Sequence, residues 1–229
     1  MALASLYEEL KDDAAAESQH RAALKADPED EDQYVQFAAF LSKRKRFSEA
    51  AAVLDEAPKG DQEGDDLFGD LLRDLYYSDE KEALEELAYS QPQRTERSAV
   101  ANLYLGYVLS ENGKSLQAIP LFKKAAAARK DWSEPYEAMA QSYRNLRNWR
   151  AAIKAADTAI ALQEDSSTAY FYRACALARL RRTKEAMYSL EKAVELDPEL
   201  REYLAEESDL KILASRPGFK KLLVVPPEQ

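Results

Sequence analysis

Residues 99–132 read AVANLYLGYVLSENGKSLQAIPLFKKAAAARKDW, and the same kinds of residue return every 34 positions in both directions along the chain. A fixed period of this length is typical of two-helix solenoids, in which small residues let neighbouring helices cross closely. The sequence therefore predicts an all-α, right-handed solenoid of antiparallel helix pairs. Small residues recur at three places of the window: Ala38, Gly106, Ala140 and Ala174; Ala50, Ala118, Ala152 and Ala186; Ala57, Ala125, Ala159 and Ala193.

Each window divides into two predicted helices with a short turn between them. In residues 99–132 the turn is Asn112-Gly113, and apolar residues recur at helical spacing on both sides of it. Proline after Asp27 and after Asp197 ends the first and the last of these helix pairs, because proline cannot continue the preceding helix. The apolar positions are Leu105, Val108 and Leu109 before the turn, and Leu116, Ile119, Leu121, Phe122 and Ala125 after it.

These recurring residues resemble the tetratricopeptide repeat family, whose 34-residue pattern places a Leu-Gly pair, alanines and an aromatic residue at fixed positions. The resemblance covers nearly the whole chain and implies a tetratricopeptide-like superhelix. It rests on Leu105-Gly106, Leu109, Ala118, Phe122 and Ala125. The pattern is broken at Phe68, Leu72, Asn102 and Arg173.

The period divides the chain into seven segments. They are a partial N-terminal unit (1–30), a full unit (31–64), a degenerate unit (65–98), three further units (99–132, 133–166 and 167–200) and a C-terminal cap with a tail (201–229). The turn-rich stretch 58–64 predicts irregular or hinged geometry before the degenerate unit.

The C-terminal segment resembles the cap found on bacterial members of the family. The resemblance lies in Ser208-Asp209-Leu210 and in Arg216-Pro217-Gly218-Phe219. Such a cap closes the apolar face that the last helix pair would otherwise expose. We expect the closing residues to be Leu210, Leu213, Phe219 and Leu222.

Charge is distributed unevenly along the chain, whose net charge is -10. Residues 1–98 hold 12 Lys and Arg against 25 Asp and Glu, a net charge of -13, whereas residues 99–229 have a net charge of +3. The acidic half should repel nucleic acid and anionic lipid. The basic runs at 43–46 and 179–184 fall where a first helix ends, so we interpret them as cations at helix C-termini in preference to phosphate-binding sites. We therefore predict no nucleic-acid partner.

The sequence contains no recognisable catalytic or metal-binding motif. Cys175 is the only cysteine and His20 the only histidine, which excludes a disulfide, a cysteine cluster or a multi-histidine metal site within this chain. Nucleophile elbows, phosphate-binding glycine loops and zincin helices are absent. We predict a non-enzymatic protein that uses no metal and no cofactor.

No stretch approaches the ~20 consecutive apolar residues of a membrane-spanning helix, and the first residues lack the pattern of a secretory signal. A cytoplasmic location is therefore predicted. The alternative is a targeting signal upstream of Met1, because the first repeat window would begin before the chain does.

In the tetratricopeptide family the first helix of each pair lines a concave groove, and the resemblance implies the same here. The lysines and asparagines with which some family members clamp chaperone carboxylates are missing from the corresponding positions. We predict a protein-interaction scaffold or adaptor that holds a peptide or a partner helix in this groove, with tyrosine and arginine side chains as anchors. The expected contact residues are Leu103, Tyr107, Glu137, Gln141, Arg144, Asn145, Phe171 and Arg179.

Two other functions stay open at this stage. The chain could be the localising or regulatory arm of a larger enzyme whose catalytic domain lies upstream. It could also be a homo-oligomer that self-assembles through its N-terminal unit, because the first helix has apolar residues but no preceding neighbour. Those residues are Leu3, Leu6, Tyr7 and Leu10.

Overall fold

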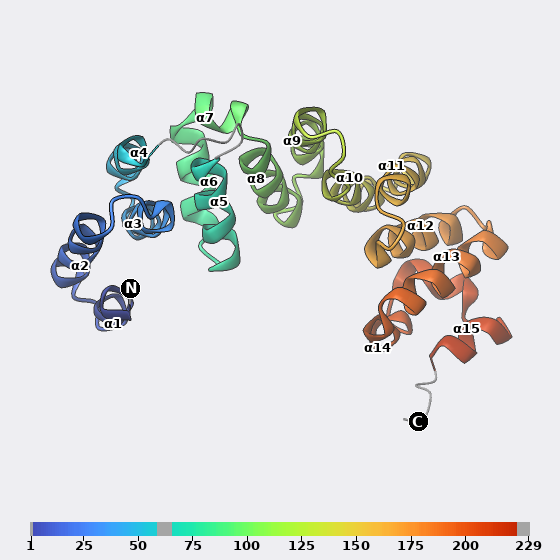
Figure 1. The fold of residues 1–229 in the computed structure, drawn as a ribbon. Coiled ribbons are helices and arrows are strands. Elements are labelled where there is room, and N and C mark those ends of the chain that lie inside the picture. The colour runs from blue at the N-terminus through green and yellow to red at the C-terminus, as the bar shows by residue number, and fades with distance from the viewer. Residues whose placement is uncertain (1, 59–65, 224–229) are drawn as a thin grey trace. The chain divides into compact units, whose positions relative to one another are not determined.

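The computed structural model describes residues 2–58 and 66–223, and every regular element in these ranges is a helix (Figure 1). The residues 59–65, which include most of the stretch expected to be irregular or hinged, lie outside the described residues. The fold is an all-α helical repeat solenoid. The chain separates into two units, Met1–Val108 and Leu109–Gln229. Among the described helices, none is both long enough and apolar enough to cross a membrane.

The N-terminal unit consists of three helix pairs followed by a short extra helix and most of α8. Residues 65–98, expected to hold one degenerate helix pair, contain three helices, because Pro92 starts the six-residue helix α7 directly after α6. The helices are α1 (Ala2–Glu9), α2 (Asp13–Ala26), α3 (Glu31–Lys43), α4 (Phe47–Glu56), α5 (Leu67–Tyr77), α6 (Lys81–Ser90), α7 (Pro92–Arg97) and α8 (Ala99–Glu111).

The C-terminal unit continues the pairs and ends in a group of short helices (Figure 1). The paired helices are α9 (Ser115–Ala128), α10 (Glu134–Asn145), α11 (Trp149–Leu162), α12 (Ser167–Arg179) and α13 (Thr183–Leu196). The short elements are the 3₁₀ helix η1 (Pro198–Leu200), α14 (Arg201–Leu204), the 3₁₀ helix η2 (Ser208–Leu213) and α15 (Pro217–Leu222).

The turn inside each pair has the same backbone conformation. At a spacing of 34 residues, one residue per turn has φ between 56° and 75°, in the left-handed region: Lys11, Lys45, Asp79, Gly113, Arg147 and Arg181. Its N–H bonds to the carbonyl three residues earlier, and the next N–H bonds to the carbonyl five residues earlier, at 2.8–3.1 Å. These two bonds make the Schellman motif that ends an α-helix. Only one of the six turns uses glycine, the residue that takes this conformation without strain.

The small residues of the 34-residue pattern lie where the helices meet. All but one of the eleven alanines at the three recurring positions are fully buried, and the other, Ala57, is 9% exposed. Leu72 stands where the pattern has a small residue and is also fully buried. The periodicity therefore marks the packed interior, as the sequence predicted.

The cap closes the last helix pair. Leu210, Leu213 and Phe219 are buried in one cluster with residues of α12 and α13, and Leu222 packs against it as a partly buried residue. The last apolar helix face is thereby covered by the expected residues.

Ion pairs join neighbouring helices of the N-terminal unit and account for the basic run at 43–46. Arg46 contacts Glu17 of α2 at 2.5 Å and Glu49 of α4 at 2.6 Å. Arg44 pairs with Asp13, and Lys45 pairs with Glu86 of α6 at 3.0 Å. Three of the four cations thus bind carboxylates of the chain itself.

Substitutions at two of the left-handed turn residues should change the free energy of unfolding in opposite directions. Replacing Arg147 with glycine should remove left-handed strain of ~1–2 kcal/mol at an entropic cost of ~0.5–1 kcal/mol, so the free energy of unfolding should rise by up to ~1.5 kcal/mol. Gly113→Ala should lower it by ~1 kcal/mol. Urea unfolding followed by circular dichroism measures both. In the control Lys154→Gly, in the middle of α11, glycine should cost ~1 kcal/mol; stabilisation there would contradict the explanation.

Hydrogen bonds from Arg46 and Arg21 lower the pKa of Glu17 from 4.5 to about 2. A carboxyl group with a depressed pKa contributes stability that is complete above the unfolded pKa and is lost as the pH falls through the folded pKa. The stability difference between the native chain and Glu17→Gln should therefore be constant above about pH 5.5 and shrink between pH 4.5 and 2. Urea titrations across this range test it, with the exposed turn residue Glu29→Gln as control. If the stability difference at pH 2.5 equals the difference at neutral pH, the lowered pKa of Glu17 is refuted.

Candidate functional site

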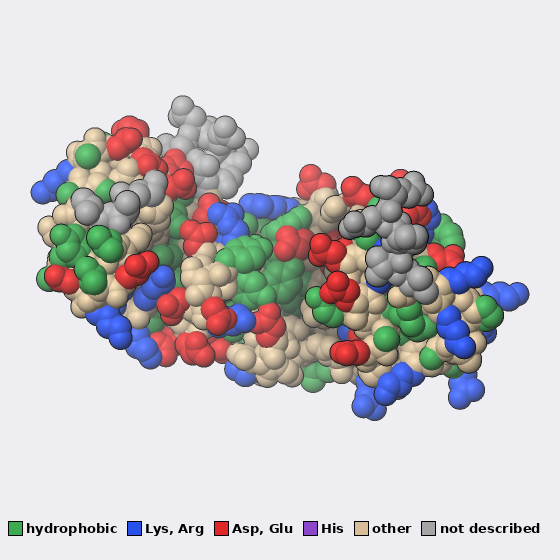
Figure 2. All heavy atoms as spheres, turned by 90° about the horizontal axis from the view of Figure 1, so that it is seen from below, with side chains coloured by type: hydrophobic (Ala, Val, Ile, Leu, Met, Phe, Trp, Pro, Cys, Tyr) green, Lys and Arg blue, Asp and Glu red, His purple; other side chains and the backbone are tan. Residues whose placement is uncertain are grey.

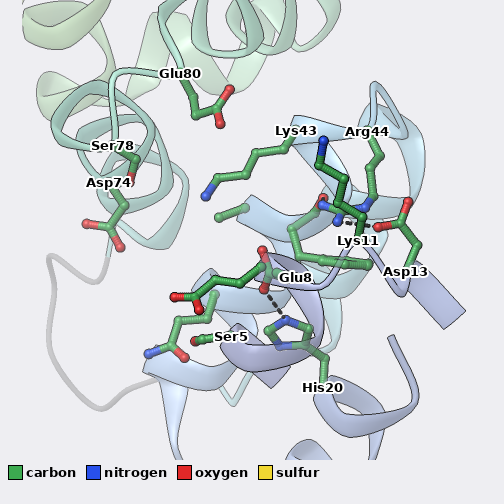
Figure 3. A pocket seen from close by; sticks show the side chains of 14 residues that line it. Ser5, Glu8, Lys11, Asp13, His20, Lys43, Arg44, Asp74, Ser78 and Glu80 are labelled. Carbon is green, nitrogen blue, oxygen red and sulfur yellow. Dashed lines mark hydrogen bonds and ion pairs between the residues drawn. The ribbon is translucent and has the colours of Figure 1, made fainter. Parts of the chain in front are cut away.

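The first helices of the N-terminal pairs, α1, α3 and α5, line a hollow of about 930 Å³ (Figure 3). Its apolar floor comes from Ala39 and Phe40 of α3. The remaining lining is polar: Ser5, Glu8, Glu9, Lys11, Asp13, His20, Gln36, Lys43, Arg44, Asp74, Ser78 and Glu80. Acidic and basic side chains also lie intermixed over the N-terminal helices in the space-filling view (Figure 2). The hollow can therefore accept a segment that carries both apolar and charged groups.

One wall of the hollow is fixed by His20. Its Nε2 atom lies 3.0 Å from Glu8 Oε1, and its ring stacks on Phe37 with the centroids 5.4 Å apart. The side chain is 8% exposed. These contacts join α1, α2 and α3, so His20 has a structural position between the helices.

Charges at the opposite side are less closely paired. Figure 3 shows Lys43 and Glu80 pointing into the hollow. The carboxylate of Asp74 is 3.8 Å from Arg73, too far for a hydrogen bond, and burial raises its pKa. A partly desolvated carboxylate gains from a cation or a hydrogen-bond donor brought by a ligand.

Tyr107, one of the expected contact residues, belongs to a cluster of four tyrosines on α5 and α8. Neighbouring rings of this cluster are 5.4–5.8 Å apart between centroids. Lys81 lies over the ring of Tyr76 at 5.5 Å. The other members are Tyr77, which is 72% exposed, and Tyr104, which is buried.

The expectation for Leu103 is corrected by its burial. Its side chain is 0% exposed and lies in the core of the N-terminal unit, so it is not available to a partner. The reason is that α8 is apolar on nearly all sides, and such a helix is buried all round. The family pattern gives the positions that face a groove but not the apolar character of an individual helix.

Glu137 and its neighbours on α10 are partly accessible. Glu137 Oε1 accepts a hydrogen bond of 2.8 Å from Ser166, the N-cap residue of α12. Burial raises the pKa of Glu137, and the bond from Ser166 opposes this shift. Gln141 is half-buried and Asn145 is exposed at the end of the helix. Phe171 of α12 is partly buried against the core.

The remaining two expected residues are held by the chain's own cap. Arg144 Nε donates to Asp209 Oδ2 at 2.6 Å, and its Nη2 atom lies 2.7 Å from Glu207 Oε1. Arg179 is 3.6 Å from Asp209 and lies over the ring of Trp149 at 5.1 Å. The sequence placed both arginines on a binding surface but did not reveal the acidic segment that covers them.

A group of possible metal ligands lies in the same place. The Sγ atom of Cys175 and the carboxylates of Glu207 and Asp209 lie within 4.8 Å of one another. Arg144 already occupies both carboxylates, and burial raises the pKa of the Cys175 thiol, which opposes the thiolate that a metal needs. The geometry thus favours an ion-pair cluster over a metal centre.

Residues 137–200 match the family model described as "Tetratricopeptide repeat". This segment carries tetratricopeptide repeats. The matched segment covers most of α10 and all of α11, α12, α13 and η1. No curated protein matches the sequence.

Several solved structures share the fold at low sequence identity. A crystal structure of MamA is 17% identical, with a TM-score of 0.50, and the alignment covers 89% of this chain and 99% of that one. YrrB, described as a TPR protein with an unusual peptide-binding site, is 17% identical with a TM-score of 0.55 over 78% of this chain and 92% of that one. The APC/C hetero-tetramer Cut9–Hcn1 is 15% identical with a TM-score of 0.59, over 97% of this chain and 41% of that chain.

Within the repeats, removing the charge of Glu137 should stabilise the fold. A raised pKa means that the protonated carboxyl group stabilises the fold and that this contribution is lost as the pH rises. Glu137→Gln keeps an acceptor for Ser166 without the buried charge, so its thermal midpoint should exceed that of the native chain at pH 7. The excess should shrink as the pH falls through the raised pKa of Glu137 towards the ordinary glutamate value of 4.5, and it should change no further below that value. The control substitution Glu164→Gln, at an exposed residue, should leave the thermal midpoint and its pH dependence unchanged. A midpoint for Glu137→Gln below that of the native chain at pH 7 would refute the argument.

Proposed function

We propose that this tetratricopeptide repeat protein is a non-enzymatic interaction scaffold that holds a peptide or a partner helix along the first helices of its pairs. Tetratricopeptide repeat proteins are typically interaction modules without catalytic activity. Stacked repeats present such a surface already ordered, which reduces the entropic cost of binding. A cytoplasmic location is part of the proposal, supported by the single unpaired cysteine.

The observation that carries this proposal is the hollow along α1, α3 and α5. Its volume of about 930 Å³ suits several side chains of a bound segment. Ala39 provides apolar contact, while Lys43, Asp74 and Glu80 offer charges that can fix the orientation of the segment. The residues expected from the sequence begin at Leu103 of α8, and the hollow adds residues of α1, α3 and α5 to them.

The proposed contact residues beyond the hollow are those of the expected set that reach the surface. Tyr107 contributes through the tyrosine cluster, since tyrosine gives both contact area and a polar end. Glu137, Gln141, Asn145 and Phe171 provide further contacts from α10 and α12. Arg144 and Arg179 can take part only when the cap no longer holds them. Leu103 is not included, because it is buried.

Self-assembly is a second candidate, favoured by two exposed leucines, one on α1 and one directly after it. Leu6 is 47% exposed and Leu10 is 66% exposed. A second copy of the chain that packs on this helix would bury them. Sedimentation that finds only monomer at high concentration would exclude this candidate.

Ala39→Arg tests the hollow, because Ala39 is a partly exposed residue of its floor. A long charged side chain there should fill the space and weaken partner capture at least tenfold without loss of helicity. The matched control Ala52→Arg lies on an exposed face of α4. Capture from lysate, quantified by mass spectrometry, compares the two variants with the native chain. If Ala39→Arg retains every protein that Ala52→Arg retains, the hollow is not the binding site.

A further inference from the structure

The cap places two carboxylates on one arginine. Glu207 and Asp209 are two residues apart, and both contact the guanidinium of Arg144, at 2.7 Å and 2.6 Å. Arg144 is the one arginine of α10, and η2, which carries Asp209, packs against α12. Contact with a guanidinium through two of its nitrogens is the geometry by which arginine recognises acidic groups.

The acidic segment lies on the surface much as a bound peptide would. The Glu207 side chain also accepts from the N–H of Asp209 at 3.0 Å and thereby holds both carboxylates in one orientation. Leu210, the next residue, is fully buried in the cluster with α12 and α13. The segment thus combines two acidic contacts with one apolar anchor, as short recognition segments often do.

The surface below this segment is built mainly by α10 and α12. Cys175 is fully buried, and burial raises the pKa of Tyr172 to about 12. Arg179 adds a second cation at the edge, where its side chain is 42% exposed. A dry floor strengthens an ion pair relative to one in open solvent.

We propose that the Arg144–Arg179 surface is a binding site for acidic partner segments of the pattern Glu-x-Asp-Leu, and that the chain's own residues 207–210 occupy it in the structure. The inference rests on the proposed scaffold function and names the chemistry of one partner class. The partner segment competes with the cap for Arg144, so the accessible site is the one from which η2 has been displaced.

This competition is severe in the native chain. A tethered segment acts at an effective concentration in the mM range, so a free peptide must exceed that to displace it. A variant with a weakened cap should expose the site at lower peptide concentration. Glu207→Gln, Asp209→Asn and Leu210→Ala together remove the two acidic contacts and the apolar anchor while leaving α10 and α12 unchanged; this triple substitution is called the cap-released variant.

The test measures binding of a fluorescent peptide with the sequence of residues 205–216 to the full-length chain by fluorescence polarisation. The cap-released variant should bind the peptide at least tenfold more tightly than the native chain. A control peptide with Gln and Asn in place of its Glu207 and Asp209 equivalents should bind at least tenfold more weakly than the acidic one. Equal binding of both peptides to the cap-released variant would overturn the proposal.

Two further arms separate this proposal from the scaffold function. Arg144→Gln in the cap-released background should reduce peptide binding at least tenfold, and an unchanged affinity would overturn the proposal. Ala39→Arg in the same background should leave peptide binding unchanged, because the hollow lies in the N-terminal unit. Loss of capture in Ala39→Arg supports the scaffold function independently of any peptide result.

Hydrogen exchange on the native chain covers the case in which the cap-released variant fails to fold. Acidic peptide at several mM should accelerate exchange of the Leu210 and Ala214 amides, which bond to carbonyls of Glu207 and Lys211. The neutral peptide should not do so. Unchanged exchange with the acidic peptide would overturn the proposal.

Discussion

The left-handed residue at the end of each first helix is the constraint on which the repeat structure depends. It turns the chain so that two successive N–H groups satisfy carbonyls of the last helical turn, and the second helix begins within two residues. Because this turn recurs every 34 residues, the alanines return to the same helix crossings. The hollow of the N-terminal unit and the docking surface of the cap both use first helices that these turns position.

Local properties of the sequence were sufficient for the repeats, the turns and the buried small residues. They were insufficient where a helix departs from the family pattern. The extra helix α7 follows from Pro92, which starts a helix where the pattern has a connection. Leu103 was assigned to a groove by position, but the apolar character of α8 on all sides decides its burial. The hollow needs α1, α3 and α5 together, and no pattern in the sequence indicates that their charged residues lie close to one another.

The ion pairs between distant residues are likewise not predictable from the sequence pattern. Arg46 meets Glu17 from 29 positions away, and Arg144 meets Asp209 from 65 positions away. Such pairs depend on the geometry of packed repeats and on the direction of long side chains, which a sequence pattern does not contain. Their effect here is to decide which cations stay available to other molecules.

The position of Cys175 makes its thiol a natural reporter of cap opening. The thiol is buried in the cluster that includes Leu210 and Leu213, and its raised pKa keeps it protonated. An alkylating reagent needs an exposed thiolate, so it can react only in molecules whose cap has opened. Because this is the only cysteine in the chain, the alkylation rate of the unmodified protein would count the fraction of open molecules without a label, a tag or a substitution.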